Sequence, residues 1–279
     1  MPRPRVVIVG GGFGGLYAAR ALRGTPVDVT LVDRTNHHLF QPLLYQAATA
    51  TLAPTDITAP IRWLLRRQQN AEVVMATVQG VDTARRIVAL DDGRQLPYDY
   101  LILAAGARHS YFGHPEWEAV APGLKSIDDA IHIRERVLLA FERAELADDP
   151  AERARLLTFV IVGGGPTGVE MAGMLPVIAR KTLRPDFRRV DTATARVILL
   201  EGGPRLLPAF PDDLSEAARR SLAELGVDVR SGQRVSRVED GAVHVGDQVI
   251  PAGTIVWAAG NEASPLGASL GVPRDRAGR

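Results

Sequence analysis

The sequence predicts an α/β protein with two Rossmann-like dinucleotide-binding domains, each carrying a small antiparallel β excursion. Three observations support this prediction. A glycine-rich turn follows a short apolar run twice, at Gly10 and again at Gly163. Each turn leads into a segment with helical apolar spacing, and each half later closes in an apolar run ending in Ala-Ala-Gly. The two turns are separated by about 150 residues, the length of one domain.

The elements of the first half follow from apolar runs and their stops. Residues 6–9 are apolar and mostly β-branched, as in a strand buried on both faces. A helix is expected over 13–22, stopped by Gly24, and a second strand over 27–32 that ends in Asp33. Further elements are a short helix within 34–55, a helix through ITAPIRWLLRRQ capped by Asp56, antiparallel strands within 72–98, and a buried strand over 100–104.

The second half repeats this order after a long helix. That helix is expected over 127–147, ended by Asp148-Asp149-Pro150. The repeat then predicts strands at 157–162 and 196–200, helices from Thr167 and over 214–225, and short strands at 227–230, 235–238 and 242–250. The run TIVWAAG repeats the earlier LILAAG.

The composition excludes several classes of function. Hydrophobic residues make up 46% and charged residues 23%, and the net charge of +1 gives no electrostatic reason for a nucleic-acid partner. The chain has no cysteine, so it has neither disulfides nor thiolate chemistry, and electron transfer would need a bound cofactor. Among six histidines the close pair is His37-His38, and we expect no metal site.

Targeting segments are not expected either. The apolar run VVIV near the N-terminus is too short for a signal peptide and is broken by glycines. The longest uncharged apolar stretch, residues 156–169, contains glycines and a proline, so no membrane-spanning helix is predicted.

The first glycine turn has the spacing of a dinucleotide-binding fingerprint. Gly10 permits the tight turn, Gly12 lets backbone approach a pyrophosphate, and Gly15 allows close packing of helix on strand. The phosphates would lie at the positive end of the following helix. Asp33 ends the second strand 18 residues after Gly15, where a carboxylate accepts hydrogen bonds from the adenosine ribose.

The second turn repeats the fingerprint with Gly163, Gly165 and Gly168. Its acid, Glu201, follows 33 residues after the third glycine because the stretch ARKTLRPDFRRVDTATA extends the connection. A carboxylate here favours the ribose hydroxyl of NADH over the 2′-phosphate of NADPH, although the nearby Arg205 would soften that preference. Two dinucleotide sites without metal or thiol suggest one flavin and one nicotinamide, with hydride passing between stacked rings.

Four stretches carry a narrower resemblance: VIVGGGFGGLYAARAL, NHHLFQPLLYQAATATL with its continuation APIRWLL, VIVGGGPTGVEMAG, and LLEGGPRLLPAF with TIVWAAG. They resemble the two-dinucleotide-binding-domain flavoproteins (the pyridine nucleotide-disulfide oxidoreductase-like superfamily), and more narrowly the type II, non-proton-pumping NADH:quinone oxidoreductases. The double glycine motif occurs throughout the superfamily, whereas HLFQPLLYQAAT followed by PIR is more specific. The resemblance implies an FAD domain over 1–110, with 261–279 returning to it but incomplete, and an inserted NADH domain over 111–260.

The same resemblance assigns the site residues. Those implied for FAD are Gly10, Gly12, Phe13, Gly14, Gly15, Asp33, Arg34, Gln41, Pro42, Leu43, Val78, Ala105 and Gly106, with Gln41–Leu43 beside the flavin ring. Those implied for NADH are Gly163, Gly165, Pro166, Thr167, Gly168, Glu170, Glu201, Ala259 and Gly260. Glu170 resembles the family's acid near the nicotinamide–flavin contact, which implies a catalytic role in orienting nicotinamide or delivering protons. The alternative is a carboxylate that only complements the helix dipole.

The activity implied is transfer of two electrons from NADH through FAD to a membrane quinone. In that family the chain continues past this point with a flavin-binding Gly-Asp motif, quinone contacts and amphipathic membrane helices, so we expect a fragment or a truncated form. The implied location is cytoplasmic, peripheral on the inner face of a bacterial cell membrane. A homodimer is one assembly that the resemblance leaves open.

The run IRWLLRR is expected to be an ordinary surface helix.

Two alternatives remain at this stage. A reductase of the same fold would pass electrons from NAD(P)H to a ferredoxin- or rubredoxin-type protein. A truncated nucleotide-binding module would bind the dinucleotide without catalysis. Sulfide and disulfide reductases are excluded because both use cysteines.

Overall fold

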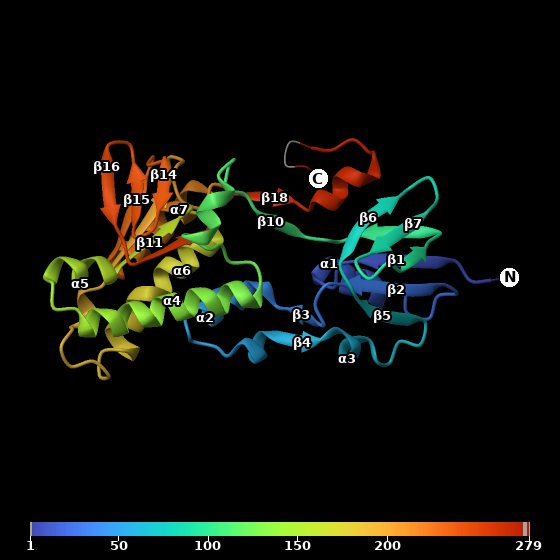
Figure 1. Cartoon of the computed structure of the whole chain (residues 1–279), viewed down its shortest axis with the longest axis horizontal. Coiled ribbons are helices and arrows are strands. Elements are labelled where there is room, and N and C mark those ends of the chain that lie inside the picture. The colour runs from blue at the N-terminus through green and yellow to red at the C-terminus, as the bar shows by residue number, and fades with distance from the viewer. Residues whose placement is uncertain (1, 276–277, 279) are drawn as a thin grey trace. The chain divides into compact units, whose positions relative to one another are not determined.

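The computed structural model describes residues 2–275 and 278, which form two compact units. Unit 1 holds the chain up to Phe40, Thr55–Arg108 and the segment that begins at Asn261. Unit 2 holds Gln41–Pro54 and His109–Gly260. Each unit contains a four-stranded parallel sheet with helices and a three-stranded antiparallel sheet (Figure 1). The α/β class predicted from the sequence is therefore confirmed.

The sheet of unit 1 has the order β5-β2-β1-β9 and is parallel throughout. Its strands are β1 (Arg5–Val9), β2 (Asp28–Asp33), β5 (Ala71–Met75) and β9 (Tyr100–Leu103). Alternate side chains of β1 enter two apolar layers, because successive residues of a strand point to opposite faces. Ile8 packs in the layer that includes Leu16 of helix α1 (Phe13–Ala21), and Val9 packs in the other.

That second layer is formed with the antiparallel sheet of β6 (Val78–Asp82), β7 (Ile87–Leu90) and β8 (Gln95–Pro97). Leu266 and Leu270 of the 3₁₀ helix η6 (Pro265–Leu270) pack against the same layer. In Figure 1, β6 and β7 lie against the strands β1 and β2. Residues far apart in sequence therefore close the core of unit 1.

The connection between β2 and β5 differs from its prediction. Strand β3 (His37–Leu39) pairs antiparallel with β4 (Thr58–Pro60), with η1 (Gln41–Leu43), α2 (Leu44–Ala48) and η2 (Pro54–Ile57) between them. Helix α3 (Ile61–Leu65) begins only at Ile61, so the prediction that Asp56 caps a long helix was wrong. Pro60 lacks an N–H and disfavours helical dihedrals at the residue before it, which leaves Thr58–Pro60 extended.

The sheet of unit 2 repeats that of unit 1, with the order β13-β12-β11-β17. Its strands are β11 (Thr158–Val162), β12 (Arg196–Glu201), β13 (Val227–Ser231) and β17 (Thr254–Trp257). Its helices are α6 (Pro166–Val177), which a π-helical turn over Ile178–Thr182 continues, and α7 (Asp212–Glu224). The antiparallel sheet consists of β14 (Arg237–Glu239), β15 (Ala242–Val245) and β16 (Gln248–Pro251).

Helix α4 (Ile127–Leu146) runs beside α2 within unit 2 (Figure 1). The segment 41–54 therefore packs with unit 2, although the expected first domain, 1–110, contained it. A short helix, α5 (Pro150–Leu156), follows where the sequence predicted only a stop. The Asp149 carboxylate accepts the N–H groups of Ala151 and Glu152, and Pro150 occupies the first helical position, as at many helix starts.

The remaining short elements are β10 (Ala107–His109), which pairs with β18 (Asn261–Ala263), and the 3₁₀ helices η3 (Pro115–Ala119) and η5 (Thr192–Thr194).

Candidate functional site

Each central strand ends in a glycine turn of the same construction. Gly10 follows β1 with a φ of +105°, and Gly163 follows β11 with a φ of +112°. The N–H of Gly10 donates to the carbonyl of Val32 at 2.7 Å, and the N–H of Gly163 donates to that of Leu200 at 2.7 Å. Both turns thus lie at the carboxyl ends of parallel strands, where α/β folds bind ligands.

The first and third glycines of each turn are required by packing. A Cβ on Gly10 would lie 2.3 Å from the Ala104 carbonyl oxygen, and one on Gly15 would lie 1.7 Å from the Gly10 oxygen. In the second turn a Cβ on Gly163 would lie 2.6 Å from the Ala259 nitrogen. One on Gly168 would lie 1.8 Å from the Gly163 oxygen. The fold itself therefore excludes a side chain at these four positions.

The second glycines have no such requirement within the chain. Gly12 and Gly165 have extended backbone, with φ of −69° and −75°. Apart from the adjoining residues and the nearby backbone of the helix, no heavy atom of the described residues lies within 4 Å of a Cβ built on either one. They stand as N-caps of α1 and α6, whose first turns contain no acidic residue and leave N–H groups without helical partners. A pyrophosphate fits this open, electropositive cradle.

The acids at the ends of the second strands hold the glycine turns. The Asp33 carboxylate accepts the N–H of Gly11 at 2.5 Å and that of Thr35 at 2.7 Å. The Glu201 carboxylate accepts the N–H of Gly164 at 2.6 Å and that of Gly203 at 2.5 Å. Since each carboxylate oxygen has two acceptor positions, capacity remains for a ribose hydroxyl.

Sequence reasoning missed the middle glycines, Gly11 and Gly164. A Cβ on Gly11 would lie 2.4 Å from Cδ1 of Ile61, and one on Gly164 would lie 2.6 Å from Cδ2 of Leu206. The signal was present in the sequence, because both copies read Gly-Gly-Gly. His38 was missed as a partner of this turn, and its Nδ1 lies 3.0 Å from the Gly11 carbonyl oxygen.

The other residues implied for FAD lie in different elements, and some of them belong to unit 2. Phe13 and Gly14 begin α1, and the Phe13 ring meets His38 and Phe40 edge-on, with centroids 5.0 and 5.6 Å away. Val78 is buried in β6, Arg34 is exposed, and Ala105 and Gly106 follow β9, where Ala105 lies beside Gly10. Gln41, Pro42 and Leu43 form η1, which belongs to unit 2 rather than unit 1.

The residues implied for NADH all lie in unit 2. Pro166 and Thr167 begin α6, and Ala259 and Gly260 follow β17 as Ala105 and Gly106 follow β9. The Arg205 guanidinium donates to the carbonyls of Pro208 and Phe210, and its Nε lies 3.3 Å from the Asp212 carboxylate.

Glu170 lies half-buried on α6, in its second turn. Burial raises the pKa of its carboxyl above the usual glutamate value. Among residues 2–275 and 278 the carboxylate makes no hydrogen bond or ion pair. A partly desolvated acid without a protein partner is suited to exchange a proton at a higher pH than an exposed glutamate does.

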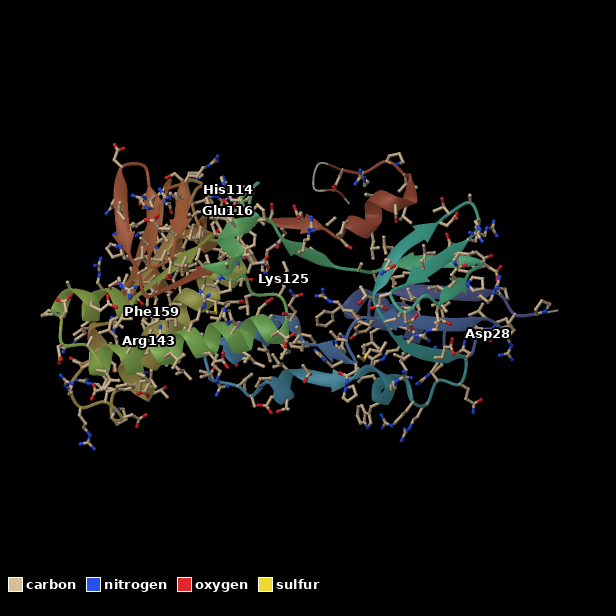
Figure 2. All side chains as sticks on the ribbon, viewed as in Figure 1. Asp28, His114, Glu116, Lys125, Arg143 and Phe159 are labelled. Atoms are coloured by element: carbon tan, nitrogen blue, oxygen red, sulfur yellow. The ribbon has the colours of Figure 1, made fainter. Side chains whose placement is uncertain are left out.

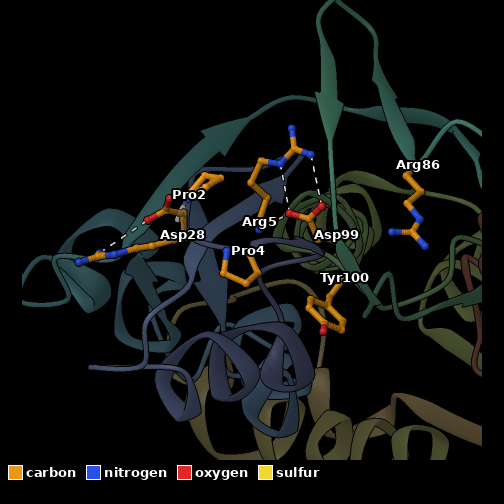
Figure 3. A pocket seen from close by; sticks show the side chains of 8 residues that line it. Pro2, Pro4, Arg5, Asp28, Arg86, Asp99 and Tyr100 are labelled. Atoms are coloured by element: carbon orange, nitrogen blue, oxygen red, sulfur yellow. Dashed lines mark hydrogen bonds and ion pairs between the residues drawn. The ribbon is translucent and has the colours of Figure 1, made fainter.

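A surface pocket of about 870 Å³ lies at the other end of the unit 1 sheet. Its lining includes Arg5, Asp28 and Tyr100, which begin β1, β2 and β9 (Figure 3). The Arg5 guanidinium donates to the Asp99 carboxylate, and Arg3 pairs with Asp28 at 3.8 Å. Because the first glycine turn follows the opposite end of β1, this pocket is separate from the candidate nucleotide site of unit 1.

Two features of the described part of the chain bear on metals and membranes. No cluster of three or more potential metal ligands occurs there. None of the helices there combines the length and apolar character needed to cross a bilayer.

Comparison of the sequence with known proteins gives a family and close relatives. Residues 4–279 match the pyridine nucleotide-disulphide oxidoreductase family. The type II NADH:quinone oxidoreductase Ndh of Mycobacterium tuberculosis is 47% identical, over 99% of this chain and 62% of that protein. The external alternative NADH-ubiquinone oxidoreductase of Yarrowia lipolytica is 32% identical, over 94% of this chain and 48% of that protein. The chain thus spans less than two thirds of these relatives.

Solved structures agree with this comparison. NDH2 from Plasmodium falciparum, in complex with NADH, matches with a TM-score of 0.89 at 26% identity. That match covers 96% of this chain and 57% of the other. The sulfide:quinone oxidoreductase of Aquifex aeolicus matches with a TM-score of 0.76 at 21% identity, over 96% of this chain and 61% of the other, which is a likeness of fold.

Proposed function

The chain belongs to the pyridine nucleotide-disulphide oxidoreductase family, and from this membership we propose that it acts as a type II NADH:quinone oxidoreductase. It binds FAD in unit 1 and NADH in unit 2. Electrons pass from NADH through FAD to a membrane quinone, and no protons are pumped. The names of the M. tuberculosis and Y. lipolytica relatives support the donor and the acceptor.

One observation carries the nucleotide part of this proposal. Gly12 and Gly165 are glycines although nothing within the described chain restricts their side chains. A bound pyrophosphate would supply such a restriction, because both positions open onto helix N-termini that attract one. The same construction appears twice, as a protein that binds two dinucleotides requires.

The residues then have distinct tasks. N–H groups at the start of α1 hold the FAD pyrophosphate, Asp33 accepts a ribose hydroxyl, and Ala105-Gly106 borders the cofactor. The start of α6 and Glu201 do the same for NADH, and Glu201 favours NADH because it repels a 2′-phosphate. Bound FAD would supply the hydride acceptor, and the chain has no cysteine thiol of its own to take up electrons.

Glu170 is proposed to hold a proton near the start of α6, close to the bound nicotinamide. Its raised pKa brings proton exchange closer to neutral pH, where a general acid is most effective. The quinone places the reaction at a membrane, so the protein is proposed to associate peripherally with the inner face of the cell membrane.

The test is spectroscopic and starts from the purified chain supplied with FAD. We expect a yellow protein whose flavin absorbance bleaches on anaerobic addition of NADH and recovers on addition of a soluble quinone. A colourless protein that still binds NADH would contradict the proposal and leave a nucleotide-binding module. Recovery with a ferredoxin-type acceptor alone would contradict the quinone assignment.

A further inference from the structure

Phe112 has an unusual conformation for an aromatic residue. Its φ is +52°, in the left-handed region that a bulky side chain seldom adopts, and Gly113 follows with a φ of +94°. The side chain gains little from burial in return, because the residue is 66% exposed. Such backbone strain, when it is held in place by the surrounding structure, tends to occur at ligand-binding positions.

The neighbours of Phe112 hold it in that position. The Ser110 carbonyl accepts the indole N–H of Trp257 at 2.9 Å. Tyr111 is 8% exposed and stacks on the Trp257 ring with centroids 5.3 Å apart, and its hydroxyl donates to the Ala121 carbonyl at 3.0 Å. Because Ser110 and Tyr111 are fixed in the core of unit 2, Phe112 is not a residue of a loose loop.

The residues after Phe112 are also held. His114 stacks on Trp117 with centroids 4.1 Å apart, and its Nδ1 lies 3.0 Å from the Glu116 carboxylate. Figure 2 shows His114 and Glu116 together at the start of η3. The exposed ring of Phe112 therefore lies between two segments that are held in place, one before it and one after it.

Phe112 lies beside the turn that follows β17. The N–H of Ser110 donates to the Gly260 carbonyl at 3.3 Å, and a Cβ on Gly260 would lie 2.7 Å from Cζ of Phe112. The adjoining Ala259 lies against Gly163 of the second glycine turn. The ring thus borders the same turn system that would hold the dinucleotide.

The strand order indicates which end of the dinucleotide Phe112 borders. In the order β13-β12-β11-β17, Glu201 ends β12 and would hold the adenosine ribose, and α6 after β11 would hold the pyrophosphate. A dinucleotide laid across these strand ends carries its nicotinamide toward β17. Phe112, beside Gly260 at the end of β17, is on the nicotinamide side.

We propose that Phe112 is a substrate-contact residue whose exposed ring packs on the nicotinamide end of NADH. This inference rests on the proposed function, because it takes unit 2 as the NADH site. An aromatic ring gives a flat apolar surface for the nicotinamide ring at small conformational cost. Contact with the ligand would cover the ring and account for its strained, exposed position.

The test separates the two ends of the ligand with two probes. NADH and ADP-ribose, which lacks nicotinamide, are titrated calorimetrically and without oxygen into the chain saturated with FAD that has first been reduced with dithionite. The FAD site is then closed to both probes, and NADH binds without transferring its hydride. For Phe112→Ala we expect the Kd of NADH to rise about three- to tenfold, the range for loss of an aromatic contact. The Kd of ADP-ribose should stay unchanged, and Phe112→Tyr should restore NADH affinity.

Trp63→Ala is the matched control, since Trp63 is another aromatic residue, 56% exposed, in unit 1. It should change neither Kd. If Phe112→Ala fails to fold, Phe112→Gly removes the ring and accepts the positive φ, with the same expected result. Equal loss of both ligands, or no loss of NADH affinity, would overturn the role of Phe112. If the unaltered chain bound neither probe, the nucleotide assignment of unit 2 would itself be wrong.

Discussion

The glycines after β11 differ in the space around an added methyl group. Substitutions at these positions should therefore affect either the stability of the fold or the binding of NADH. We expect Gly165→Ala to change the free energy of unfolding by less than about 1 kcal/mol, because its backbone suits alanine and the space is open. NADH affinity should fall roughly tenfold or more, equivalent to about 1.4 kcal/mol, because the methyl occupies the pyrophosphate position.

Gly168→Ala is the matched variant in the same turn. Its methyl would collide with the Gly163 carbonyl oxygen, so we expect a loss of about 2 kcal/mol or more in a urea titration. If Gly165→Ala were the more destabilising of the two, or bound NADH normally, the cradle would not be a pyrophosphate site.

Glu170→Gln should stabilise the protein at neutral pH. Burial raises the pKa of the folded carboxyl above 4.5, so the folded state binds the proton more tightly than the unfolded chain does. Stability therefore falls as the pH rises from the unfolded pKa through the folded pKa, and the penalty persists at pH 7. Glutamine carries no charge and escapes this penalty. Tm should be higher for the variant at pH 7, and the difference should shrink as the pH falls below 4.5.

Glu216→Gln provides a control of opposite sign. Hydrogen bonding to Arg219 lowers the pKa of Glu216, so its contribution is present above its unfolded pKa and lost in acid. This variant should gain no stability at pH 7. A higher Tm for both variants at pH 7 would mean that the effect of Glu170 does not come from burial.

At the scale of single residues, the sequence predicted that the outer glycines follow central strands and that Asp33 and Glu201 end the neighbouring ones. The structure has them there because these positions follow from local strand–turn–helix spacing, while their role in binding stays a prediction. It did not predict Gly11 and Gly164, whose constraints come from Ile61 and Leu206, residues distant in the chain. The exposed Phe112 was not singled out either, since its backbone angle has no signal in composition or periodicity.

Among the elements, α4 offers a direct test of helix capping. Ser126 accepts the Asp129 N–H at 3.1 Å, and the Asp129 carboxylate accepts the N–H groups of Ser126 and Lys125 at 2.8 and 2.9 Å. Asp129→Ala should cost about 1 kcal/mol in a urea titration because these donors lose their acceptor. Asp128→Ala, in the same turn but exposed, should cost only a few tenths of that through the helix dipole. Equal effects would show that the hydrogen bonds accepted by Asp129 add nothing to stability.

Element boundaries were predicted well where apolar periodicity was continuous. Strands β1 and β11 and helix α4 lie within a residue or two of their expected ranges. Predictions were wrong where a tertiary contact overrode a local pattern. The segment before Ile61 is a strand because it pairs with β3, and α5 exists because Asp149 and Pro150 start a helix as readily as they end one.

For the molecule as a whole, the sequence predicted the α/β class and the repeat of one architecture in two units, since both follow from the repeated glycine turns. It did not predict that 41–54 would pack with unit 2. That placement depends on the contact of α2 with α4, two helices with about 80 residues between them, and no local pattern carries such a pairing. The parallel sheets explain why the cradles look alike, because each arises where a central strand turns into its helix.

The two cradles also have an evolutionary consequence. Suppose that copies of the gene drifted under a selection that asked only for a soluble, well-formed product. Codons 10, 15, 163 and 168 would remain glycine, since the backbone itself rejects every alternative. Codons 12 and 165 would diversify first. A lineage that had lost its redox role would therefore record the loss at these two positions while its architecture remained intact.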